Sequence, residues 1–337
     1  MKKIFNLIVS FVLLAGFSAC NKDGSDKPGL PPAPVPTVNY KGLTFISSGK
    51  STVCLAKVGA PDEITLEYST DESQWNPYTL GEKISLADGT FLLFRAGEQK
   101  NLTFSKGSDS YYHFEISGPV TAQGNIMSLL DRNFSTPLST NAFFALFEGC
   151  KSLLSAPELP ATTMAQGCYF RMFAECTGLT SAPKLPAEAL AYNCYGRMFK
   201  GCSALTYVPD LPATKMEAYC YNSMFANCTS LKFAPELPAT RLDTGCYHCM
   251  FEGCTSLTSA PELPATELVS NCYEFMYKDC RNLRYVIGLF TTEPSKKTTE
   301  EWLSGVAASG TFIKSEKATW DVTGADGVPE GWKIETW

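Results

Sequence analysis

Apolar and polar residues repeat along the middle of the chain with a step of 26 residues. The words CYGRMFKGCSALTYVPDLPATKM, which begin at Cys194, return with small changes in the copies before and after it. The first copy, from Ala142, and the last, from Cys272, are variants. A stack of coils needs atypical end copies as caps, so the pattern predicts a solenoid of about six copies. Two cysteine series mark its step: Cys168, Cys194, Cys220, Cys246 and Cys272, and Cys150, Cys176, Cys202, Cys228, Cys254 and Cys280.

The first half of each copy predicts a helix. Leu190, Cys194 and Met198 follow one another at intervals of four residues, and they would share one face of a helix. Gly201 fits the position just past the end of that helix.

The second half of each copy predicts a short strand and a proline corner. Leu205 begins the extended run Leu-Thr-Tyr-Val-Pro, and Pro209 and Pro212 exclude a helix there. One coil cannot bury its apolar side alone, so stacked coils should bury their leucines in one ladder: Leu153, Leu179, Leu205, Leu231, Leu257 and Leu283.

The recurring words Phe-x-x-Cys-x-x-Leu, over residues 142–290, resemble the BspA-like leucine-rich repeat family of bacterial surface proteins. The resemblance implies a right-handed solenoid with a stacked sheet along one side, and adhesion or partner binding outside the cell. A period of 26 also lies in the range of leucine-rich repeats. We therefore expect an α+β chain whose centre, residues 124–290, is a leucine-rich repeat solenoid with an N-terminal cap.

The flanks of the array predict two further parts. Residues 38–123 alternate short apolar runs with turn residues and favour a small all-β, sandwich-like domain. A short helix over Asn125–Asp131 would cap the first copy. Residues 291–337 form a C-terminal cap, in which a helix would start at Thr298 and four tryptophans would cover the end of the solenoid. The expected strands are Ser51–Leu55, Ile64–Tyr68, Lys83–Leu86, Phe91–Arg95 and Tyr111–Ser117.

The N-terminus is typical of an exported chain. Residues 1–19 hold a basic start, a short apolar run and small residues, as in a signal peptide. Cys20, directly after Ser18 and Ala19, resembles the lipidated cysteine of bacterial lipoproteins. The proline-rich residues 20–37 would then be a tether. The resemblance implies a lipid anchor in the outer membrane and exposure at the surface of a Bacteroides-type cell.

The charge balance excludes one class of partner. Lys+Arg is 28 and Asp+Glu is 34; removal of residues 1–19 takes away two lysines, so the remaining charge is −8. The sequence has no basic block, which argues against nucleic acid.

The cysteines predict a packing ladder. On one helix, Cys194 and Cys202 would be about 12 Å apart, beyond the reach of a disulfide. Equivalent cysteines of adjacent copies could lie about 5 Å apart, which would permit bonds, but the even series shows no pairing and favours free thiols. His248 and Cys249 suggest zinc, yet both stand at positions that vary between copies, and we expect no metal site.

We expect no enzyme and no cofactor. The two histidines, His113 and His248, lie in different parts of the chain, and no nucleophile, phosphate-binding or metalloprotease motif is present.

Two columns of residues on the strand make a candidate binding surface. Aromatic residues recur two positions after the ladder leucines, and carboxylates follow three positions later. On a strand, neighbouring side chains face opposite ways, so either this aromatic column or the next one points out; lateral packing between coils is the alternative role. The candidate residues are Tyr207, Phe233 and Tyr285 with Asp210, Glu236 and Glu262.

These observations predict a surface lipoprotein that binds an extracellular protein or host matrix through the repeats. The alternative is a glycan-binding lipoprotein of a polysaccharide uptake system, in which the aromatic side chains stack on sugar rings.

Overall fold

The computed structural model describes residues 42–337, except 99 and 102. The signal peptide, Cys20 and the tether predicted from the sequence lie outside the described residues. Residues Val38–Trp337 form one compact unit. Among the described residues, no helix has the length and apolar character needed to span a bilayer.

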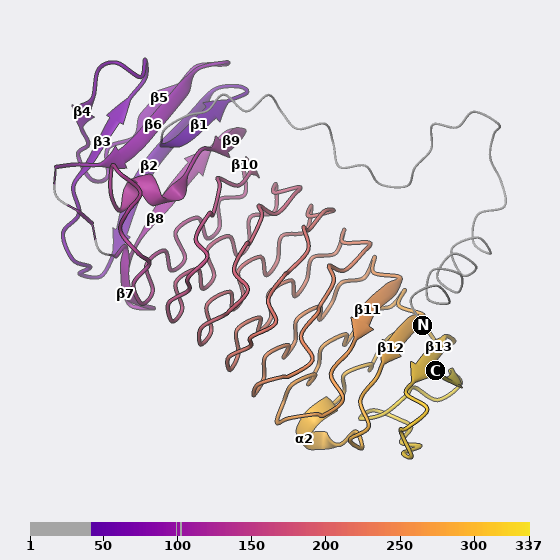
Figure 1. Ribbon diagram of the computed structural model, residues 1–337. Coiled ribbons are helices and arrows are strands. Elements are labelled where there is room, and N and C mark those ends of the chain that lie inside the picture. The colour runs from indigo at the N-terminus through magenta and orange to yellow at the C-terminus, as the bar shows by residue number, and fades with distance from the viewer. Residues whose placement is uncertain (1–41, 99, 102) are drawn as a thin grey trace, which may run out of the picture. The chain divides into compact units, whose positions relative to one another are not determined.

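Two sheets form the N-terminal part of this unit (Figure 1). In one sheet the strand order is β10-β9-β1-β6-β3-β4, and in the other it is β5-β2-β8-β7. The strands are β1 Leu43–Ser47, β2 Ser51–Val58, β3 Leu66–Ser69, β4 Asn76–Pro77, β5 Ile84–Leu86, β6 Phe91–Ala96, β7 Ser105–Gly107, β8 Ser110–Ser117, β9 Val120–Gln123 and β10 Leu153–Ser155.

Aromatic side chains join the two sheets. Phe45 of β1 and Phe94 of β6 meet Phe114 of β8, with ring centroids 5.0 and 5.7 Å apart. All three rings are buried. The strands β2, β3, β5, β6 and β8 fall on the five predicted ranges, because alternation of apolar and polar residues marks a half-buried strand directly.

The predicted helix of each repeat is wrong. The structure is mostly β, and the described helical elements are only the 3-10 helix η1, Ile126–Leu129, and the α-helix α2, Lys296–Thr299. Within each repeat, successive tight turns replace the helix. In the copy around Cys194, the backbone has positive φ at every fourth residue, at Asn193, Arg197 and Gly201.

The hydrogen bonds of these turns alternate between two directions. The N–H of Met198 donates to Tyr195 O within the turn, at 3.2 Å. The N–H groups of Tyr195 and Phe199 donate instead to the next coil, to Cys220 O and Met224 O, at 3.0 and 2.9 Å. Each coil therefore closes its own turns and bonds its neighbour, so buried backbone groups find partners without a helix.

The spacing of apolar residues could not distinguish these turns from a helix. Buried pairs such as Cys194–Tyr195 and Met198–Phe199 recur every four residues, close to the helical 3.6. Each copy has three positions with positive φ, and the residue types at the first and third of them distinguish the turns from a helix. Glycine, asparagine and aspartate, which tolerate positive φ, recur there: Asn141, Gly149, Gly167, Asn193, Gly201, Asn227, Gly245, Gly253, Asn271, Asp279 and Gly305.

Two columns of stacked rings fill the inside of the turns. Tyr195 lies 5.9 Å from Tyr169 and 5.8 Å from Tyr221, with the ring planes within 8° of parallel. Phe199 stacks in the same way on Phe173 and Phe225, at 5.5 and 5.7 Å. The predicted leucine ladder is also confirmed, since Leu153, Leu179, Leu205, Leu231, Leu257 and Leu283 are fully buried.

The strand side of the solenoid is a parallel ladder. Its C-terminal coils form the sheet β11-β12-β13-β14. Earlier coils are joined by single bridges such as Ser181–Tyr207 and Phe233–Ser259. Prolines such as Pro209 and Pro235 lack the N–H that a longer ladder would need. The strands are β11 Ser259–Leu263, β12 Tyr285–Gly288, β13 Thr311–Lys314 and β14 Lys333–Thr336.

Other parts of the unit cover both ends of the solenoid. At the first coil, β10 pairs with β9 in parallel, and Phe114 stacks on Phe147 at 5.1 Å. At the last coil, Trp302 stacks on Tyr273 at 6.1 Å, and Trp320 stacks on Phe290 at 5.3 Å.

The tryptophans of the C-terminal part divide between core and surface. Trp302, Trp320 and Trp332 are buried, whereas Trp337 is exposed. The helix α2 begins after Ser295, so the predicted helix start at Thr298 was late.

The thirteen described cysteines are free and buried. The thiol of Cys202 donates to Phe173 O, in the previous coil, at 3.1 Å, and Cys228 does the same to Phe199 O at 3.2 Å. The prediction of free thiols rested partly on a helix that the structure does not contain. The predicted packing role of the cysteines agrees with their burial. Cysteine suits the position because it is small, apolar and a weak donor.

Replacement of Glu175 by glycine tests in solution whether this segment forms turns or a helix. Glu175 has φ +60°, and four equivalent positions carry glycine. We expect Glu175→Gly to raise the free energy of unfolding by about 1 kcal/mol, because it relieves a strained backbone. Lys200→Gly, which changes a half-buried position of the next coil where φ is negative, should lower it by about as much. Chemical denaturation measures both, and a loss of stability in both variants would contradict the turns.

Candidate functional site

The strand side presents the aromatic column to solvent. Tyr207 is 40 % exposed and Phe233 is 65 % exposed. The parallel bridges Ser181–Tyr207, Phe233–Ser259 and Ser259–Tyr285 place these residues in one register from coil to coil. In the next column Ala182, Val208 and Val286 are buried, and the alanines of the other coils are partly buried against the core. The structure therefore decides the orientation that the sequence left open: the aromatic column points out.

Tyr285 differs from the other two aromatics. It lies in β12, is half-buried, and pairs with Thr311 of β13 on its other side. Burial raises the pKa of its phenol, and the charge of Glu335 adds to the effect. Tyr285 is thus partly exposed and is paired with a neighbouring coil on both sides, whereas Tyr207 and Phe233 each have a single parallel bridge within the described residues and are more exposed.

The carboxylates line the same side. Asp210 and Glu236 are exposed, and Glu262, in β11, is half-buried. Burial raises the pKa of Glu262, and the negative charge of Glu236 raises it further, so the two carboxylates lie close enough to interact. None of the three makes an ion pair with another described residue. The six predicted residues therefore share one side of the solenoid, with rings and carboxylates in neighbouring columns.

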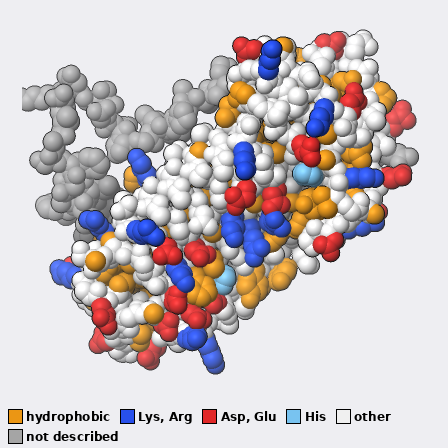
Figure 2. Space-filling view, turned by 180° about the vertical axis from the view of Figure 1, so that it is seen from behind, with side chains coloured by type: hydrophobic (Ala, Val, Ile, Leu, Met, Phe, Trp, Pro, Cys, Tyr) orange, Lys and Arg blue, Asp and Glu red, His pale blue; other side chains and the backbone are white. Residues whose placement is uncertain are grey.

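The sequence analysis missed a second surface, which we call the turn side. It consists of the outward residues of the tight turns, two of every four, and these change type from coil to coil. One column of these turns reads Glu148, Ala174, Lys200, Ala226, Glu252 and Lys278; its two alanines are buried, and its longer side chains are half-buried. The face in Figure 2 shows acidic and basic side chains gathered near the middle of the coils, with hydrophobic side chains beside them.

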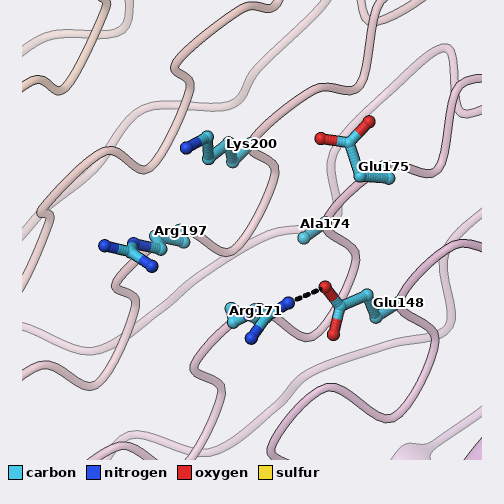
Figure 3. A pocket seen from close by; sticks show the side chains of 6 residues that line it. All are labelled: Glu148, Arg171, Ala174, Glu175, Arg197 and Lys200. Carbon is cyan, nitrogen blue, oxygen red and sulfur yellow. Dashed lines mark hydrogen bonds and ion pairs between the residues drawn. The ribbon is translucent and has the colours of Figure 1, made fainter.

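A hollow of about 200 Å³ opens on the turn side. Figure 3 shows Ala174 in the middle of its lining residues, with Arg197 and Lys200 projecting to one side. Arg171 and Glu148 form an ion pair at its edge. The residues that line the hollow stand at positions that differ between copies of the repeat. This variation is the sequence signal from which the turn side could have been predicted.

His248 and Cys249 also lie on the turn side. The variable position of Cys249 favours a surface thiol, but Cys249 is buried, and its sulfur is 3.9 Å from Nε2 of His248. Nε2 of His248 is also 3.5 Å from the carboxylate of Glu274. Both contacts use the same ring nitrogen, so the three groups do not form a relay. No cluster of metal-ligating side chains suited to an ion occurs in the described part of the chain.

Burial keeps the cysteines and tyrosines of the core protonated. It raises the pKa of the Cys202, Cys220 and Cys254 thiols to about 12. It also raises the pKa of Tyr195 and Tyr221 well above the usual value. A thiol is nucleophilic only as thiolate, so these cysteines pack and do not react.

Comparison of the chain with family models, with curated proteins and with solved structures gave no match.

The buried thiols predict loss of stability at alkaline pH. Unfolded cysteine loses its proton near pH 8.5, whereas the folded thiols retain it to about pH 12. Above pH 8.5 the unfolded state therefore binds fewer protons than the folded state, and stability falls as pH rises. At pH 9.5 each such thiol should cost about 1.4 kcal/mol.

Denaturant titrations at pH 7.5, 8.5 and 9.5 measure this effect. Cys202→Ala should reduce the pH slope by about one proton, although the variant is less stable at neutral pH. A midpoint that stays constant between pH 8 and 10 would contradict the prediction.

Proposed function

We propose that this chain is a surface-exposed, lipid-anchored protein that binds an extracellular protein or host matrix through the strand side of its solenoid. The observation that carries the proposal is the exposed pair Tyr207 and Phe233, each joined by a parallel bridge to the same position of an adjacent coil. Exposed aromatic side chains on a rigid surface are typical of binding hot spots because they bury large areas with little loss of conformational freedom.

The repeat architecture supports the same proposal. The right-handed leucine-rich repeat class, inferred from the recurring Phe-x-x-Cys-x-x-Leu words, is part of it, as is anchorage to the outer membrane by a lipid on Cys20. Stacked coils give an extended surface on which a partner can contact several repeats at once. The core is built from stacked rings and buried thiols, so it leaves no reactive thiol for catalysis.

A second candidate function rests on the carboxylates beside the rings. Asp210, Glu236 and Glu262 can accept hydrogen bonds from hydroxyl groups while Tyr207 and Phe233 stack on apolar ring faces. This arrangement would suit a glycan-binding protein of a polysaccharide uptake system.

The test is a binding screen of residues 21–337, which include the whole described unit, against matrix proteins and polysaccharides together. Replacement of Tyr207, Phe233 and Tyr285 by alanine should weaken binding about thirtyfold or more, since a hot-spot residue contributes about 2 kcal/mol. Tyr192→Ala, which removes a similarly exposed tyrosine outside the strand side, is the control.

A protein hit lost in the triple variant and kept in the control supports adhesion. A polysaccharide hit with the same loss, and no protein hit, favours the glycan candidate. Binding that survives the triple variant would show that the strand side is not the site. Because Tyr285 is half-buried, thermal melting of each variant must accompany the screen, and the pair Tyr207→Ala/Phe233→Ala repeats it without that position.

A further inference from the structure

The hollow on the turn side owes its existence to one small residue. In its column of the turns, Ala174 stands between Glu148 and Lys200, whose long side chains rise on either side. The volume of about 200 Å³ is below the range of about 300–1,000 Å³ that drug-sized ligands occupy. A single small ring or anionic group is therefore the largest unit that it can hold.

The charges around the hollow are not all neutralised. Arg171 is paired with Glu148. Arg197 and Lys200, in the next coil, make no ion pair with any described residue, and the guanidinium of Arg197 lies 5.8 Å from the ring centroid of Phe170. Figure 3 shows both cations projecting to the same side. Two cations on the same side of the hollow, neither with an ion-pair partner among the described residues, favour an anion.

The hollow also contains acceptors for hydroxyl groups. The carboxylate of Glu175 lies against Gly201, whose lack of a side chain leaves room for it there. Glu148 supplies a second carboxylate at the opposite edge. A ligand with a carboxylate at one end and hydroxyl groups elsewhere matches this mixture better than a peptide carboxylate, which brings no hydroxyls.

We propose that this hollow binds a carboxylate-bearing sugar unit. The carboxylate contacts Arg197 and Lys200, and the sugar hydroxyls donate to Glu175 and Glu148. The site lies on the turn side, apart from the aromatic column, so it does not depend on the proposed function. The sugar can come from a free monosaccharide or from one residue of an acidic polysaccharide.

The test measures binding of galacturonate, oligogalacturonate, neutral galactose and a short acidic peptide to residues 21–337 by calorimetry. Ala174→Gln fills the hollow without changing charge, and long side chains at the equivalent positions of other coils show that the backbone tolerates it. It should weaken binding of the acidic sugars about tenfold or more. Glu252→Gln, which places the same side chain in the same column three coils further on and outside the hollow, should change binding less than about twofold.

Charge removal gives a second, independent readout. Arg197→Gln with Lys200→Gln should also weaken binding about tenfold or more and flatten its salt dependence. Lys232→Gln, which removes an exposed cation on the strand side, should leave binding unchanged. Thermal melting confirms that each variant is folded.

The outcomes separate the sources and decide the proposal. If both galacturonate and oligogalacturonate bind, the proposal is supported and a free sugar is a sufficient ligand. If only oligogalacturonate binds, the proposal is supported and the ligand is a polymer. No binding of either acidic probe at millimolar concentration overturns it. Equal binding of galactose, binding of an acidic peptide alone, or binding that Ala174→Gln leaves intact overturns it as well.

Discussion

The solenoid depends on one pattern of backbone hydrogen bonds. Alternate N–H groups close a turn within their own coil, and the others donate to the coil 25 residues further along the chain. Neither set is sufficient alone, since the turns without the neighbouring coil would leave half of their donors unpaired in an apolar interior. Each coil is therefore stable only against its neighbours, which explains why both ends are covered by other structure.

The side chains of the core follow from that pattern. Because every coil bonds the next in the same register, equivalent residues lie directly above one another, and identical rings stack with nearly parallel planes. One cysteine series lies where the chain leaves the turns, and the thiol of each of these residues donates to a carbonyl of the previous coil: Cys176, Cys202, Cys228, Cys254 and Cys280. A larger side chain would separate the coils there, whereas a smaller one would leave a cavity.

The same register frees the outward residues to vary. Their side chains differ from coil to coil, so the strand side can present Tyr207 and Phe233 and the turn side can present Arg197 and Lys200. The two surfaces differ in chemistry: the first is aromatic and acidic, and the second combines cations, carboxylates and a small hollow. One scaffold thus offers two surfaces that can be altered independently, which is the basis for the matched controls.

The sequence by itself determined the 26-residue step, the buried leucine ladder, most strands of the N-terminal sheets and the column that holds Tyr207, Phe233 and Tyr285. These follow from local periodicity and from identity between copies. The tertiary structure decided the rest. A spacing of four residues fits a helix or a series of turns, and only the hydrogen bonds between coils favour the turns. The outward direction of the aromatic column, the effect of Glu236 on the pKa of Glu262 and the hollow lined by Ala174 all involve more than one coil, and such relations exist only once the chain has stacked on itself.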